Sequence, residues 1–325
     1  MTISTRLTQR LGVAHPILLA PMDVVADGRL AASVSQAGGF GIIGGGYGDE
    51  AWLVREMDAA GDARVGVGFI TWSLARQPRL LDLVLERRLP AVMLSFGDSR
   101  PHAHKIKHAG ALLICQVQTL AQAKDAVENG ADILVAQGAE AGGHGMSRGT
   151  MALVPAIADA APDVPVAAAG GIADGRGLAA ALMLGADGAL VGTRFYATQE
   201  AAGHATAKNR IVSASGDQTV RGILFDIARR NVWPAPYSGR VLRNEFSERW
   251  RGRETELLQH QQAEADRYAQ ARASGDFDVA AVIAGEAVDM ISDIPPARVV
   301  VERMVIQAAS LLTGASNRYR LLEQR

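Results

Sequence analysis

The chain has 325 residues, 48% of them hydrophobic and 21% charged, which is ordinary for a globular protein. Lys and Arg number 33 against 34 Asp and Glu, and the resulting net charge of −1 argues against nucleic-acid and membrane-surface partners. The single cysteine, Cys115, excludes disulfide frameworks and thiolate metal sites within one chain.

The first residues, MTISTRLTQRLG, lack the apolar core of a signal peptide. No apolar run reaches the roughly 18 residues that a membrane span needs. We therefore expect a cytoplasmic enzyme.

Eight short apolar runs follow one another along the chain, separated by segments with helical spacing. They are continuous rather than alternating, which is typical of parallel strands covered on both faces. Glycine-containing junctions recur between the helical segments and the runs that follow them. The runs are 16–22, 39–45, 64–70, 91–97, 112–117, 133–138, 165–170 and 188–195.

This repeat of strand and helix predicts an α/β fold, a closed (β/α)8 TIM barrel. A doubly wound open sheet is the competing fold, and the barrel is favoured because the strand count reaches eight and glycine-rich segments follow several strands. We assign residues 1–205 to the barrel, completed by an apolar helix near 297–312. Residues 206–296 lose the strand rhythm and predict a smaller, mainly helical C-terminal cap domain.

The first predicted strand ends in Pro21 and Met22. Proline fixes the backbone as the strand leaves the sheet, and the methionine would then point at the barrel mouth. A simple strand stop is the alternative, but a planar cofactor would find a soft, polarisable contact there. Gln116 ends the fifth strand, where its amide either bonds a heterocycle or is a satisfied polar strand end.

The sixth strand ends at Gln137 and continues as GAEAGGHG. Gly142 and Gly143 would let a flat ligand lie close to the backbone. His144 would face that ligand, and an imidazole with an unperturbed pKa near ~6.5 suits proton abstraction around neutrality. Glu140 either orients the histidine or caps a turn, and the turn is favoured.

The seventh strand ends in Gly170 and Gly171, just before a helix that starts near Asp174. Bare backbone N–H groups beside a helix N-terminus favour an anion, although Gly-Gly alone can be no more than a tight turn.

The segment VGTRF follows at the end of the eighth strand, and the loops after strands seven and eight form the common phosphate site of barrel enzymes. We therefore predict phosphate binding by the amides of Gly171, Gly192 and Thr193, with the Thr193 hydroxyl. Arg194 is either a phosphate ligand or part of a structural ion pair.

The segment SRPHAHKIKHAG contains His102, His104 and His108 at a spacing that suggests metal binding. No carboxylate accompanies them in this run, and lysines lie between them. A solvated helix face explains the pattern better, and we expect no metal site.

Together, APM at the first strand, AQGAEAGGHG at the sixth, AAGGIADGRGLAAALMLGAD at the seventh and GTRF at the eighth resemble the nitronate monooxygenase family, formerly called 2-nitropropane dioxygenases. The resemblance covers roughly residues 10–200 well. It implies an FMN-dependent (β/α)8 barrel with a helical second domain and the flavin across the C-terminal mouth. His144 matches the family's catalytic histidine, a base toward neutral nitroalkanes in bacterial members. Matched cofactor positions are Pro21, Met22, Gln137, Gly142, Gly171, Leu190, Val191, Gly192 and Thr193.

The chain departs from the family pattern at two places. Many members have an asparagine after the third strand, where this chain has Gly68. An arginine–glycine pair that follows the histidine in many members is displaced here to Arg148.

The resemblance implies FMN-dependent oxidation of a nitronate or nitroalkane with O2, giving a carbonyl compound and nitrite, with His144 as the base. One alternative is an NAD(P)H-dependent FMN reductase for a quinone or enoyl thioester, in which Trp233, Tyr237 and Arg240 hold the nicotinamide. A second alternative is a flavin-free phosphate-binding barrel. The cap could also mediate a homodimer.

Overall fold

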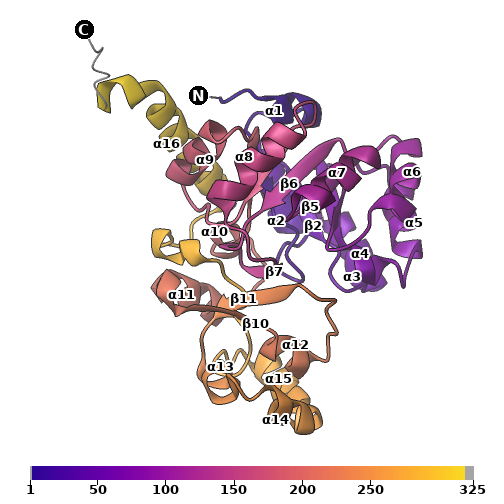
Figure 1. Ribbon diagram of the computed structural model, residues 1–325, viewed down its shortest axis with the longest axis vertical. Coiled ribbons are helices and arrows are strands. Elements are labelled where there is room, and N and C mark those ends of the chain that lie inside the picture. Colours follow the sequence, from indigo (N-terminus) through magenta and orange to yellow (C-terminus); the bar gives the residue numbers. More distant parts are fainter. Residues whose placement is uncertain (1, 319–325) are drawn as a thin grey trace.

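A barrel of eight parallel strands forms the centre of the molecule, which the computed structural model describes for residues 2–318 (Figure 1). The strands pair in the order β1-β9-β8-β6-β5-β4-β3-β2, so the predicted (β/α)8 barrel is confirmed. The barrel strands are β1 (Ile17–Leu19), β2 (Gly41–Gly44), β3 (Val65–Ile70), β4 (Ala91–Ser95), β5 (Leu112–Val117), β6 (Ile133–Gln137), β8 (Val166–Ala169) and β9 (Gly188–Val191).

Each barrel strand lies within one of the eight apolar runs. The sheet closes between β1 and the residue before β2: Leu19 N donates to Phe40 O, and Phe40 N donates to Ile17 O, both at 2.9 Å. The runs extend past the strands because their last residues leave the sheet to form the mouth. The eighth run was predicted too long as a strand, since its end forms helix α10 (Thr193–Tyr196).

Neighbouring residues on each strand divide between two hydrophobic cores, because successive side chains face opposite sides of a sheet. One set packs against the surrounding helices. The other fills the barrel interior, and helix α1 (Arg6–Leu11) adds Leu7 and Leu11 to it. The barrel is therefore a packed core, and a ligand can bind only at an end. Interior residues include Leu18, Phe40, Ile42, Met93, Ile114, Ile133, Val135 and Leu190.

Helices surround the barrel (Figure 1). The last of them, α16 (Ala297–Arg318), returns from the cap and packs between α9 and α2. No helix within residues 2–318 is long and apolar enough to cross a membrane. The other barrel helices are α2 (Gly28–Gln36), α3 (Glu50–Ala59), α4 (Thr71–Leu74), α5 (Arg79–Glu86), α6 (Arg100–His108), α7 (Leu120–Glu128), α8 (Thr150–Ala160) and α9 (Gly175–Met183).

The segment between α10 and α16 forms a mostly helical group, drawn in orange below the barrel in Figure 1. It also contains two strands that the sequence pattern did not indicate, because TVRG and SGRVL are short and mostly polar. They form a three-stranded antiparallel sheet with β7 (Gly143–Gly145), in which β11 is the central strand. This group comprises α11 (Ala205–Ser213), a 3-10 turn (Gly216–Gln218), β10 (Thr219–Gly222), α12 (Leu224–Arg229), β11 (Ser238–Leu242), α13 (Glu245–Trp250), α14 (Glu254–Gln259), α15 (Gln261–Ser274) and a second 3-10 turn (Glu286–Met290).

Candidate functional site

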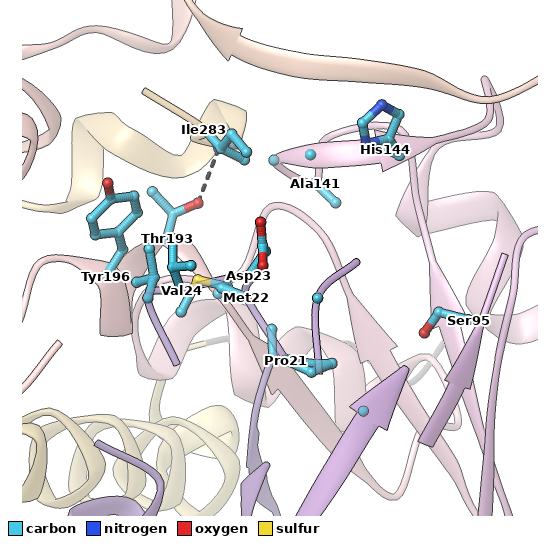
Figure 2. Close-up of a pocket in the computed structure, with 18 of the residues that line it drawn as sticks. Pro21, Met22, Asp23, Val24, Ser95, Ala141, His144, Thr193, Tyr196 and Ile283 are labelled. Atoms are coloured by element: carbon cyan, nitrogen blue, oxygen red, sulfur yellow. Dashed lines mark hydrogen bonds between the residues drawn. The ribbon is translucent and has the colours of Figure 1, made fainter. Parts of the chain in front are cut away.

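A cavity of about 410 Å³ lies at the carboxyl end of the barrel, where the strand ends meet the cap. Figure 2 shows that Met22, Thr193 and His144 come from separate elements and surround one space. The sequence-predicted residues that line it are Pro21, Met22, Gln116, Gln137, Gly142, Gly143, His144, Gly170, Gly171, Leu190, Gly192 and Thr193.

Val191 is the predicted site residue that the structure does not bring to this cavity. Its side chain is 1% exposed and packs in the core between the sheet and the helices. Leu190 points into the barrel, and its neighbour on the same strand therefore points outward. Any contribution of Val191 to ligand binding comes from its backbone.

The turn after β1 is held by glycines on the neighbouring strands. A Cβ added to Gly68 would lie 2.4 Å from Pro21 Cβ, and one added to Gly44 would lie 2.4 Å from Met22 O. Neither position can carry a side chain unless the turn moves. A side chain at Gly68 would therefore meet the Pro21 ring in the present arrangement of the turn.

Three glutamines form a hydrogen-bonded group at the base of the cavity. Gln137 Oε1 accepts from Gln116 Nε2 at 3.0 Å and from Gln118 Nε2 at 2.6 Å. Because both donors bond the oxygen, the Nε2 group of Gln137 remains to donate to a ligand. Gln118 is 2% exposed and outside the cavity lining, so it acts by orienting Gln137.

His144 reaches the cavity from β7, where it is paired with Gly239 of β11. Its Nε2 lies 2.9 and 3.0 Å from the two carboxylate oxygens of Asp226 on α12, and both side chains are 8% exposed. Arg229, one turn further along α12, donates to Asp226 at 2.8 Å. The carboxylate thus lies between the imidazole and a guanidinium.

The protonation of His144 follows from this environment. Burial lowers its pKa below the usual value, and the hydrogen bond to Asp226 opposes the shift. A neutral imidazole that donates from Nε2 to the carboxylate carries its lone pair on Nδ1. Within residues 2–318 no group bonds Nδ1, and His144 lines the cavity. The arrangement can therefore accept a proton from a cavity ligand.

An aromatic wall flanks this imidazole. Trp233 stacks on His144 with 3.5 Å between ring centroids and 7° between the planes, and its Nε1 donates to Tyr47 Oη at 3.0 Å. Phe96 meets Trp233 edge-on at 5.1 Å, and Tyr237 meets Phe96 edge-on at 5.4 Å. Tyr47, Phe96 and Trp233 line the cavity and give it an aromatic side next to the base.

Sequence reasoning missed several of these residues. Asp226 and Arg229 lie in LFDIAR, where charges three residues apart on an otherwise apolar helix were the available signal. Tyr47 and Phe96 follow strand ends, but nothing in the sequence links them to a histidine far along the chain. Asp23, directly after Met22, also lines the cavity and was not singled out.

The opposite end of the cavity contains the predicted phosphate positions. Gly170 and Gly171 have φ of 102° and 74°, a left-handed backbone that favours glycine. Thr193 Oγ1 accepts from Gly285 N at 3.0 Å, which leaves its hydroxyl hydrogen to donate. The dashed line in Figure 2 marks this bond. Asp174 caps the nearby N-terminus of α9.

Arg194 and Glu140, for which the sequence allowed two roles each, both have structural partners. Arg194 pairs with Asp293 at 3.0 Å and donates to backbone carbonyls, and it is absent from the cavity lining. Glu140 accepts from Thr150 N and Thr150 Oγ1 at 2.8 to 3.0 Å, which caps the start of α8. Asp226, rather than Glu140, orients His144.

The cavity has the features that a flat phosphorylated cofactor such as FMN requires. A Cβ added at Gly143, Gly171 or Gly192 would meet nothing closer than 3.4 Å, so each glycine leaves space on the cavity side. Bare amides and a helix N-terminus lie at one end, and an amide donor on Gln137 lies at the base. The residues present therefore fit this group.

The fold and site define an α/β barrel with a histidine–carboxylate pair beside a glycine-lined cavity. A sequence profile described as nitronate monooxygenase matches residues 4–67 and 64–307. The nitronate monooxygenase npaC of Metarhizium robertsii is 33% identical over 335 residues, which cover 92% of this chain and 92% of that protein. The chain belongs to the nitronate monooxygenase family.

Other similar proteins carry different names. An octahydro-1H-indene-4-carboxyl-CoA dehydrogenase of Rhodococcus jostii is 37% identical over 202 residues, 61% of this chain but only 57% of that protein. FabK from Thermotoga maritima superposes with a TM-score of 0.85 at 30% identity, covering 98% of this chain and 100% of that one. Nitroalkane oxidase from Streptomyces ansochromogenes superposes at 0.81 with 26% identity, covering 95% and 100%.

Proposed function

We propose that the protein is an FMN-dependent nitronate monooxygenase that converts nitroalkanes or their nitronates, with O2, into carbonyl compounds and nitrite. The observation that carries this proposal is the contact of His144 with Asp226 at 2.9 Å beside a cavity that fits FMN. Membership of the nitronate monooxygenase family and the likeness to the Streptomyces nitroalkane oxidase support it.

In this proposal His144 is the catalytic base. Its Nδ1 accepts the α-proton of a neutral nitroalkane, whose carbon becomes the nitronate. The positive charge on the ring is stabilised by Asp226 at 2.9 Å, and the carboxylate keeps the other nitrogen protonated throughout. Trp233 holds the ring plane and excludes water from one face.

The cofactor-binding residues are proposed in two groups. Gly170, Gly171, Gly192 and Thr193 would hold the phosphate through backbone amides and one hydroxyl. Pro21, Met22, Gln116, Gln137, Gly142, Gly143 and the backbone at Leu190 and Val191 would lie along the flavin. FMN, when bound, supplies the redox chemistry.

The first experiment is an absorption spectrum of the purified protein, followed by oxygen consumption with nitroethane and with ethyl nitronate. We expect a flavin spectrum, oxygen uptake and stoichiometric nitrite. His144→Asn should retain flavin and lose turnover of nitroethane. A colourless protein that FMN does not restore would instead favour the flavin-free phosphate-binding barrel, and unchanged nitroethane turnover would remove His144 from the mechanism.

A second candidate is an NAD(P)H-dependent FMN reductase acting on a quinone or enoyl thioester. Trp233 and Phe96 favour it, because they line the cavity and give a planar ring such as nicotinamide a surface to stack on. The likeness to a carboxyl-CoA dehydrogenase also favours it. Anaerobic mixing with NADH and NADPH separates the two functions: rapid bleaching of the flavin indicates the reductase.

A further inference from the structure

Asp23 places a carboxylate in the cavity without a direct counter-ion. It follows Met22 in the turn after β1, and Figure 2 shows its side chain pointing into the cavity near Thr193 and Ala141. Across residues 2–318, no side chain or backbone N–H forms a hydrogen bond or ion pair with this carboxylate. The group is therefore directed at whatever occupies the cavity.

The neighbouring strand is shaped to accept this side chain. A Cβ added to Gly46 would lie 2.1 Å from Asp23 Oδ1, and one added to Gly44 would lie 3.2 Å from Asp23 N. Both glycines belong to the GGG run that begins at Gly44, the last residue of β2. Because these residues have no side chains, the run leaves room for Asp23 at the barrel mouth.

The electrostatic surroundings leave the negative charge only partly offset. Burial raises the pKa of Asp23, and the positive charges of Arg272 and Arg229 oppose that shift. Arg229 is already paired with Asp226 at 2.8 Å. Arg272 lies at the rim, where its side chain is exposed to water. An anion entering the cavity would thus approach a carboxylate with no bound partner.

We propose that Asp23 is a specificity-determining residue that makes the cavity select uncharged substrates over anions. The inference rests on the proposed function, and there it means that a neutral nitroalkane is preferred to its nitronate. Ionised Asp23 repels the nitronate before it reaches His144, whereas a neutral nitroalkane enters and becomes charged only when His144 takes its proton.

The first test measures binding without turnover. Sodium nitrate, a planar anion with the NO2 geometry of a nitronate, is titrated into the FMN-loaded protein by calorimetry at mildly alkaline pH. We expect Asp23→Asn and Asp23→Ala to bind nitrate roughly tenfold more tightly than the wild type, the size expected for removing one nearby charge. Asp62→Asn is the control, because it also removes one negative charge but from an exposed loop that precedes β3, at the end of the barrel away from the cavity. It should bind nitrate as the wild type does. Equal nitrate affinity in Asp23→Asn and the wild type overturns the inference.

The second test compares KM for ethyl nitronate and for nitroethane. We expect Asp23→Asn to lower the KM for ethyl nitronate severalfold and to leave that for nitroethane within about twofold. Equal changes in both KM values contradict charge selection. If the wild type oxidises neither compound while Asp23→Asn binds nitrate more tightly, the charge selection stands and the proposed function fails.

Discussion

The imidazole of His144 lies parallel to the indole of Trp233, 3.5 Å away, while its Nε2 contacts Asp226 at 2.9 Å. The stack covers one face of the imidazole, and the carboxylate fixes the rotation of the ring. One nitrogen, Nδ1, is then left for the cavity. Because the two contacts constrain different degrees of freedom, substitutions at Trp233 and Asp226 should have separable effects.

Asp226→Asn should impair proton abstraction without emptying the site. An asparagine can donate its amide N–H to Nε2, which moves the imidazole proton to Nδ1 and removes the base that faces the cavity. We expect kcat for nitroethane to fall roughly 10²- to 10⁴-fold. Turnover of ethyl nitronate, which has already lost its proton, should fall much less. Steady-state kinetics on both substrates and the flavin content measure these effects.

If Asp226 had only a structural role, Asp226→Asn would have a different effect on the two substrates. Losing the partner of the partly buried Arg229 would lower the melting temperature and affect both substrates equally. Asp226→Glu restores a carboxylate and should recover part of the nitroethane activity. Equal losses on the two substrates would show that the carboxylate maintains the fold and has no part in selecting the tautomer.

Trp233→Ala should raise the pKa of His144. Burial is the largest cause of its lowered pKa, and removing the indole admits water to one face of the ring. A base acts in its neutral form, so activity on nitroethane rises with pH through this pKa. The limb of kcat/KM should move to higher pH in Trp233→Ala, toward the unperturbed value near ~6.5. Trp233→Phe keeps an apolar ring there and should leave the limb in place, and identical limbs in all three proteins would contradict the argument.

The sequence was sufficient to predict the barrel because parallel strands that are buried on both faces consist of continuous apolar runs. It was also sufficient to place His144 near the strand ends, since the residue follows the sixth apolar run closely and has glycines on both sides. It could not predict β10 and β11, because β11 is stabilised by pairing with β7, β10 is stabilised by pairing with β11, and both carry little apolar pattern of their own.

The hydrogen-bond partner of His144 could not be predicted from the sequence for a related reason. Asp226 is 82 residues away, and the contact arises only because β11 and α12 bring the cap against β7. Arg194 illustrates the converse, since its position after the eighth strand suited phosphate, but α10 turns it to Asp293. Long-range packing decides such pairings, and one sequence carries no signal for it.

Acidification should destabilise the wild type partly through His144. Burial lowers the pKa of His144 in the folded protein, whereas the unfolded chain titrates near ~6.5. As the pH falls below ~6.5 toward the folded pKa, the unfolded state binds a proton that the folded state does not, so the free energy of unfolding decreases. Above ~6.5 His144 is neutral in both states and its contribution to stability is constant.

His144→Gln should therefore lose stability less steeply than the wild type as the pH falls below ~6.5, as measured by denaturant unfolding across pH. His15 and His102, whose pKa values burial also lowers, are present in both proteins, so the difference between the curves isolates His144. Parallel curves would contradict this assignment.

Gly68→Ala should destabilise the turn that carries the proposed flavin contacts. The added Cβ would lie 2.4 Å from Pro21 Cβ and 2.5 Å from Pro21 Cγ, so the proline or β3 has to shift. We expect a loss of about 1–3 kcal/mol in unfolding free energy and weaker FMN binding, measured by thermal unfolding and flavin titration.

Gly222→Ala is the matched control for Gly68→Ala, because a Cβ there meets nothing within 4 Å. Pro21→Gly removes the two contacting atoms, so adding it to Gly68→Ala should cost less than the sum of the single changes. Additive costs would show that the two positions are independent and would contradict the steric argument.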